Sequence, residues 1–195
     1  MGFDAVDSFL VQSGALRFIA ATLGVVTLIV TAWGLGAPDS FRRFLVDLPR
    51  NRTWASGLLV INVAWSAPLT ANFLRSMEVN PQWIGLVYWV LAPLAFVYIL
   101  AFVHNFLGAR MLAWFLLLCA KPILLACLVR DTPAKFVLVV LAYYWIFAAM
   151  FIVAAPHLFR DLLLLFAERP PLLRKAMLVK GAFGVALIAL AIVAY

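Results

Sequence analysis

Charged side chains are scarce in this sequence. Only 12% of its 195 residues are Asp, Glu, Lys or Arg, whereas 67% are apolar. A soluble globular domain contains about 25% charged and about 45–50% apolar residues, so this composition excludes one. The sequence predicts an all-α protein, a polytopic transmembrane helical bundle that forms one integral membrane domain over residues 1–195.

Carboxylates are absent from the long apolar runs. The eight acidic residues lie in tails or connections: Asp4, Asp7, Asp39, Asp47, Glu78, Asp131, Asp161 and Glu168. Proton-coupled carriers and pumps use an intramembrane carboxylate, and a retinal Schiff base needs a counter-ion. Both classes are therefore disfavoured.

Histidine is also rare, with His104 and His157 the only two in the chain. Intramembrane metalloproteases and CDP-alcohol transferases need clustered His or Asp residues. An intramembrane serine protease built on Ser56 would need a histidine base in the last apolar run, where none occurs. The two histidines remain candidate cofactor ligands, but the sequence predicts neither a cofactor nor a metal ion.

Apolar runs are abundant, and at about 20 residues per span they provide six membrane spans. We expect these spans near residues 18–38, 53–74, 83–103, 111–129, 136–155 and 176–195. Asp4 and Asp7 precede the first run, with only Arg17 to balance them. This charge pattern favours a retained span over a cleaved signal peptide.

The positive charges are distributed unevenly between the connections. Nine Lys or Arg residues lie in the first, third and fifth connections, and four lie on the opposite side. The positive-inside rule therefore predicts odd connections in the cytoplasm and both termini outside. The net charge of +7 is explained in this way without a nucleic-acid partner. The short loops favour a bacterial inner membrane.

Two connections have the pattern of short helices, near residues 38–49 and 158–167. The first is expected to lie in the membrane interface, whereas the second, which is apolar all round, either lies there or packs against the bundle. In the first, apolar residues recur at helical spacing, and Asp39 or Ser40 is available as an N-cap. Four cations of this region are expected to face lipid phosphates: Arg42, Arg43, Arg50 and Arg52. They serve either as anchors or in recognition of a specific anionic lipid.

A polar stripe follows one face of the second span. Asn62, Ser66 and Thr70 are spaced i, i+4 and i+8, with Trp65 beside them. This face is expected to look into the bundle or toward a partner chain. It either hydrogen-bonds to neighbouring helices or lines a path for a substrate or ion.

Lys121 lies near the middle of the fourth span, where an ammonium group is expensive. Pro122 frees the carbonyl group of Leu118, so this oxygen is one possible acceptor for Lys121. The span midpoints also permit a cluster of Lys121 with Asn62 and Tyr144. We hypothesise that this cluster receives an acidic group from a partner subunit or an anionic ligand.

Three functions are compatible with these features. The sequence favours a non-catalytic integral subunit or scaffold of a larger membrane complex, with the lipid bilayer and other membrane subunits as partners. The alternative is a small oligomeric channel or carrier whose second span lines the path. A third is a lipid-modifying enzyme that uses His104, Arg110 or the cytoplasmic connections.

Overall fold

Six long apolar helices dominate the part of the chain that the structure describes. The computed structural model describes residues 14–102, 107–128 and 132–195, which contain no strand. Within them, six segments are long and apolar enough to cross a membrane. Their bounds are α2 (Ala15–Gly36), α4 (Arg52–Ser76), the continuous stretch α5 (Pro81–Leu86), η1 (Val87–Leu91) and α6 (Ala92–Phe102), α7 (Leu107–Leu128), α8 (Lys135–Ala154) and α10 (Pro170–Val193). The prediction of an all-α integral membrane protein with six spans is confirmed.

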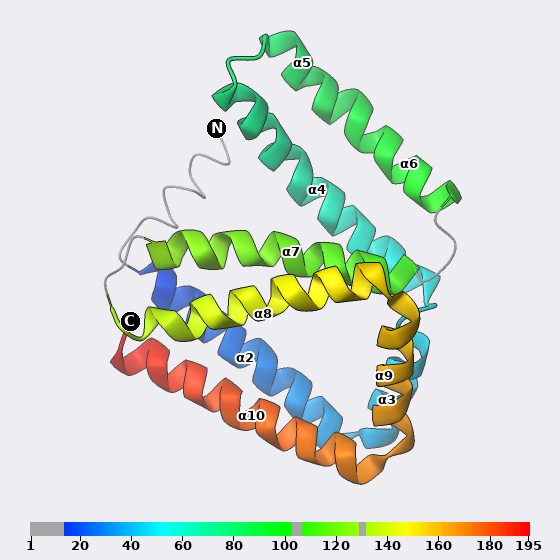
Figure 1. The fold of residues 1–195 in the computed structure, drawn as a ribbon, viewed down its shortest axis with the longest axis vertical. Coiled ribbons are helices and arrows are strands. Elements are labelled where there is room, and N and C mark those ends of the chain that lie inside the picture. Colours follow the sequence, from blue (N-terminus) through cyan, green and yellow to red (C-terminus); the bar gives the residue numbers. More distant parts are fainter. Residues whose placement is uncertain (1–13, 103–106, 129–131) are drawn as a thin grey trace.

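Two short helices join spans at one side of the molecule. They are α3 (Pro38–Asp47) and α9 (Pro156–Glu168), which pack side by side (Figure 1). Both predicted short helices are therefore confirmed. The predicted N-cap of the first one is wrong, because Pro38 occupies its first position and Ala37 is the cap residue. Proline suits this position, since its fixed φ is helical and it lacks an N–H group.

The last span begins earlier than the sequence predicted. Helix α10 starts at Pro170 rather than near residue 176. Arg174 and Lys175 lie within its first turns, because the helix continues beyond its apolar part as far as the proline pair. Hydropathy located the membrane-embedded part of this helix but not its start.

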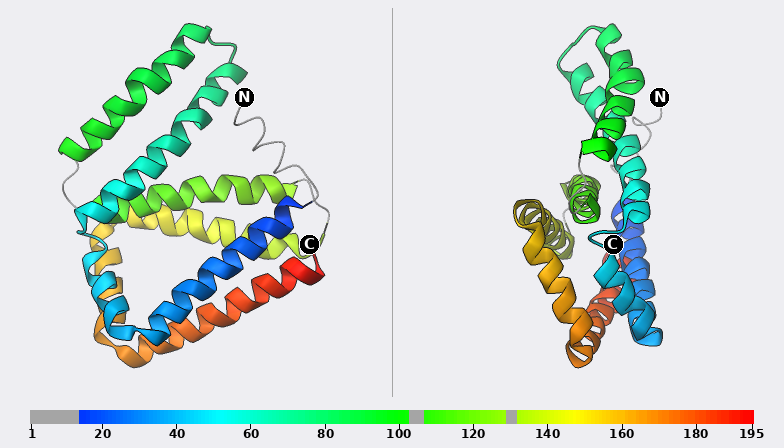
Figure 2. Two further views of the ribbon diagram at one scale, coloured as in Figure 1. Left: turned by 180° about the vertical axis from the view of Figure 1, so that it is seen from behind. Right: turned by 90° about the vertical axis from the view of Figure 1, so that its right-hand side faces the viewer.

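The spans are arranged as three pairs. Helix α2 packs along α10, α7 packs along α8, and α4 forms a hairpin with the α5–η1–α6 stretch (Figure 1). Because α4 also crosses α7, it connects the hairpin to the rest of the molecule. The side view in Figure 2 shows α8 and α9 on one face and α2, α3 and α4 on the other.

Helix α7 is the central span. Of the six spans in the described residues, it has the largest share of buried residues in its apolar part, 39%, whereas the third span has only 6%. Residues of α7 contribute to three separate apolar clusters, together with α2, α4, α8 and α10. Changes in α7 are therefore expected to affect several helix contacts at once.

Glycines allow α2 and α10 to approach closely. A Cβ atom added at Gly24 would lie 2.6 Å from Cγ1 of Ile188 and 3.0 Å from the carbonyl oxygen of Gly184. Small residues at such crossings let two backbones pack together inside lipid, where no hydrophobic driving force holds helices together. This interface therefore depends on the absence of a side chain at Gly24.

We expect Gly24→Leu to lower the free energy of unfolding by about 1–3 kcal/mol through overpacking against α10. Gly36→Leu is the matched control, because a Cβ atom at Gly36 has no neighbour within 4 Å. Unfolding in mixed detergent micelles, followed by tryptophan fluorescence, measures both variants. Equal losses in the two would show that the α2–α10 contact is not close.

Aromatic side chains hold α3 against the ends of α2 and α4. The ring of Trp33 lies 5.2 Å from that of Phe41 and 5.0 Å from that of Phe44, between centroids. The ring of Phe44 in turn lies edge-on to Trp54 at 5.7 Å. Such pairs are worth about 0.5–1.5 kcal/mol each beyond the area that they bury.

Candidate functional site

Asn62 is fully buried where α4 crosses α7. Its side chain has 0% exposure, and its Nδ2 donates to the carbonyl oxygen of Met111 at 2.9 Å. Its Oδ1 has no hydrogen-bond partner among the described residues. Asn62 therefore connects α4 to α7 through a single interhelical hydrogen bond.

The rest of the polar stripe bonds within its own helix. Ser66 donates to the carbonyl oxygen of Val63 at 3.3 Å, and Thr70 donates to that of Ser66 at 2.9 Å. Trp65 packs edge-on against Phe115 of α7, with 6.2 Å between ring centroids. Of Asn62, Ser66 and Thr70, only Asn62 makes an interhelical hydrogen bond among the described contacts.

We expect Asn62→Ala to lower the free energy of unfolding by about 1–3 kcal/mol, because it removes this bond and leaves a cavity. Thr70→Ala is the control, since Thr70 is exposed and bonds only to its own helix. We expect this control to change the free energy by less than about 0.5 kcal/mol. Detergent unfolding compares them, and an equal loss in both would contradict the role of Asn62.

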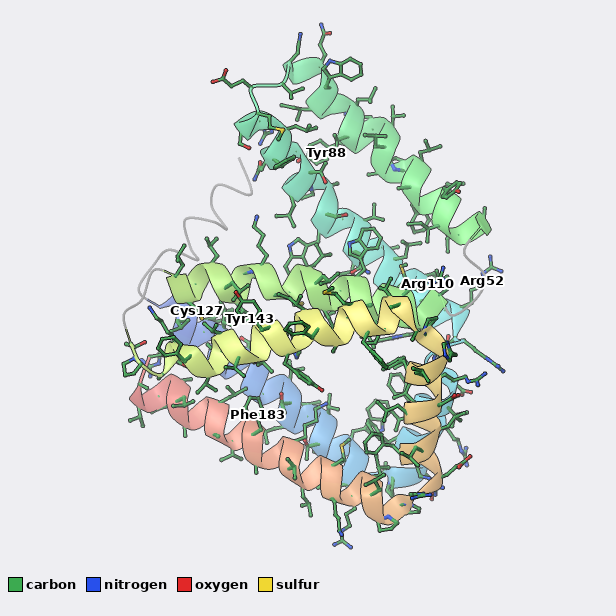
Figure 3. The ribbon with its side chains drawn as sticks, in the orientation of Figure 1. Arg52, Tyr88, Arg110, Cys127, Tyr143 and Phe183 are labelled. Atoms are coloured by element: carbon green, nitrogen blue, oxygen red, sulfur yellow. The ribbon has the colours of Figure 1, made fainter. Side chains whose placement is uncertain are left out.

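Lys121 lies in a groove between α7 and α8. The groove has a volume of about 760 Å³, and Lys121, an exposed residue, is part of its lining. Its apolar lining residues are Leu117, Ala120, Leu124, Leu125, Leu128, Val139 and Ile146. Its remaining lining residues are Lys121, Cys127, Lys135 and Tyr143. Figure 3 labels Cys127 and Tyr143 in this part of the α7–α8 pair.

The groove is apolar with positive charge. Two of its lining residues are lysines and none is acidic. All acidic residues that the structure describes belong to connections or to the short helices α3 and α9: Asp39, Asp47, Glu78, Asp161 and Glu168. Lys121 therefore has no counter-ion within the described spans.

The structure does not bring together Asn62, Lys121 and Tyr144. Asn62 contacts α7 at Met111, ten residues before Lys121 and hence about 15 Å away along the helix. Tyr144 is 67% exposed and does not line the groove, whereas its neighbour Tyr143 does. Residues at equal depth meet only if their helices run parallel, but α4 crosses α7 near the beginning of α7 (Figure 1).

Tyr143 and Lys135 are groove residues that the sequence reasoning missed. They share a spacing that could have indicated them, since Lys135, Val139 and Tyr143 recur at i, i+4 and i+8 on α8. Such spacing places side chains on one face of a helix. In an almost wholly apolar helix, however, this face is not distinguished by hydropathy.

The two histidines do not form a described site. His104 lies outside the described residues, and His157 is exposed on the first turn of α9. Among the residues described, no group of three His, Cys, Asp or Glu side chains could hold a metal ion.

The four predicted lipid-facing arginines have different environments. The Nε of Arg42 donates to the carbonyl oxygen of Ala167 at the end of α9, and its guanidinium lies 3.7 Å from Asp39. Arg43 and Arg50 are exposed. Arg52 is also exposed, donates to the carbonyl oxygen of Leu100 at 3.5 Å, and lies on the same side of the molecule as Arg110 (Figure 3). Arg42 thus joins α3 to α9, while the others remain at the surface.

Comparisons with known proteins do not place this chain in a family. No family model, no curated protein and no solved structure matches it.

Proposed function

We propose that this chain is a non-catalytic integral subunit of a larger membrane complex in a bacterial inner membrane. The observation that carries the proposal is Lys121, an exposed residue that lines an apolar groove, with no carboxylate in the described spans. A lysine at the centre of a membrane helix costs about 2.5–3.5 kcal/mol on insertion scales. An acidic group supplied from outside the chain would offset this cost.

The alternative of a channel lined by α4 has less support. Asn62 is buried against α7, and the hydroxyl groups of Ser66 and Thr70 bond to their own helix. A path for an ion or polar substrate needs polar groups that are free to replace its hydration shell. The stripe instead serves the packing and the internal hydrogen bonding of α4.

The experiment is extraction of the chain from its native membrane into polymer nanodiscs without detergent, followed by mass spectrometry of the intact particles. The proposal predicts a particle that contains this 21.6-kDa chain together with a second polypeptide species. A symmetric particle built of this chain alone would contradict the proposal and support an oligomeric pore. A single copy of the chain without other protein would also contradict it.

We further propose that the side carrying α3 and α9 faces the cytoplasm. Exposed arginines on this side, including Arg43, Arg50 and Arg52, support that orientation through the positive-inside rule. A phosphatase reporter fused after Tyr195 is expected to be active, because this enzyme matures only outside the cytoplasm. Activity of a cytoplasmic reporter at the same position would contradict the orientation.

A further inference from the structure

We infer that the α7–α8 groove seats a transmembrane helix of the partner subunit, and that an Asp or Glu of this helix faces Lys121 and Tyr143. The inference rests on the proposed function, because it names the chemistry of the partner at the same site. The depth, charge and shape of the groove favour a protein helix over an anionic lipid.

The backbone positions of Lys121 and Tyr143 lie at similar depths in the membrane, about 2 Å apart along the helix axes. Lys121 is seven residues before the end of α7, which corresponds to about 10 Å along the helix. Tyr143 is eight residues after the start of α8, which corresponds to about 12 Å. Both distances are measured from the same side of the molecule, since α7 is followed by α8 (Figure 1). A single carboxylate in the groove is therefore able to accept hydrogen bonds from the ammonium and phenol groups.

This depth favours a helix over a lipid. Phosphate groups of lipids stay outside the hydrocarbon core, which is about 30 Å thick. Side chains of a helix tilt toward its N-terminus. The side chain of Lys121 therefore leaves the backbone toward the middle of the span and away from the membrane surface at the end of α7. A carboxylate on a membrane-spanning helix reaches the depth of Lys121, whereas a lipid phosphate would contact Lys135 at the start of α8.

The shape of the groove also fits a helix. On α7 its lining runs from Leu117 to Leu128, twelve residues that extend over about 16 Å, which is about three helical turns. Small Ala120 lies between the larger residues of the lining. A helix is able to lay its apolar face into a hydrophobic groove between two packed helices.

The test uses a synthetic transmembrane peptide of leucine and alanine with one glutamate at the depth of Lys121, and a twin with glutamine in its place. Energy transfer between labelled peptide and purified full-length protein, reconstituted in phosphatidylcholine vesicles, gives the two affinities. We expect the glutamate peptide to bind about tenfold more tightly than its twin. Equal binding of the two peptides would overturn the inference.

Three variants locate the interaction. Lys121→Met is expected to abolish the preference for glutamate, and Tyr143→Phe to reduce it by about threefold. Lys180→Met is the matched control, because Lys180 is an exposed lysine of a different span, α10, outside the groove. We expect it to retain the full preference. A preference that survives in Lys121→Met would place the contact elsewhere and overturn the inference.

Anionic lipid is tested in the same vesicles. If the groove binds a helix, replacing one lipid in five with phosphatidylglycerol leaves the preference for the glutamate peptide over its glutamine twin within about twofold of its value. Complete displacement of the glutamate peptide by this lipid would assign the groove to lipid and overturn the inference. If native particles contain a second polypeptide but the groove shows no preference for the glutamate peptide, this docking site is refuted and the proposed function is not. If the groove prefers the glutamate peptide but native particles contain no second polypeptide, the proposed function is refuted.

Discussion

Replacing Gly108 with alanine is expected to lower the free energy of unfolding by about 3 kcal/mol or more. A Cβ atom at this position would overlap the carbonyl oxygen of Leu48 and lie 3.3 Å from the carbonyl carbons of Leu48 and Pro49. These are backbone atoms, so no rotation of a side chain relieves the clash. Overpacking of a close contact typically costs about 1–3 kcal/mol, and a backbone obstacle places Gly108 at the upper end.

The consequence extends beyond one contact, because Gly108 connects two parts of the fold. It lies in the first turn of α7, and Leu48 and Pro49 lead from α3 into α4. Displacing that turn is expected to disturb the α4–α7 crossing as well. Unfolding in mixed micelles, followed by tryptophan fluorescence, measures the loss.

Gly57→Ala is the control for the change of residue type. Gly57 lies inside α4, and a Cβ atom there has no neighbour within 4 Å. Alanine in an open helical position stabilises a helix by about 0.5–1 kcal/mol relative to glycine. Equal stability of Gly108→Ala and Gly57→Ala would show that α7 does not touch the turn after α3.

Lys121→Met is expected to separate the complex while leaving the isolated chain stable. Removing one member of a buried ion pair costs about 3–5 kcal/mol of association free energy, so the dissociation constant should rise at least about 100-fold. For the isolated chain, the same substitution is expected to be favourable. Loss of the ammonium group should make insertion of the α7 segment more favourable by about 2.5–3.5 kcal/mol.

Two measurements check these opposite effects. Mass spectrometry of nanodisc particles gives the fraction of chain that carries the second polypeptide, and a glycosylation assay gives the insertion free energy of the isolated α7 segment. Lys121→Arg should restore much of the complex, since it keeps the charge. If the complex survives in Lys121→Met at wild-type yield, Lys121 is not the point of assembly.

Much of the architecture could be predicted from the sequence, because hydropathy and helical spacing depend on local residues. The six spans and the short helices α3 and α9 are of this kind. Helix α10 starts earlier than hydropathy predicts, because Arg174 and Lys175 interrupt the apolar run without interrupting the helix. Only the proline pair, Pro170 and Pro171, marks where that helix begins.

The candidate site was less predictable, because it depends on how helices cross. The importance of Asn62 and Lys121 could be recognised from polar residues in apolar runs, but their separation depends on the angle between α4 and α7. Tyr143 and Tyr144 are adjacent aromatic residues, and only the packing of α8 on α7 decides which one lines the groove. The close approach at Gly108 is likewise a property of the tertiary fold.

Photocrosslinking from the groove in native membranes identifies directly what occupies the groove. A photoreactive amino acid in place of Leu117, an exposed groove residue one turn before Lys121, is expected to form an adduct with a polypeptide other than this chain. The adduct should disappear in the Lys121→Met background. The same probe in place of Val179, which is 72% exposed on α10, should capture lipid. Lipid adducts alone from both positions would contradict a partner helix in the groove.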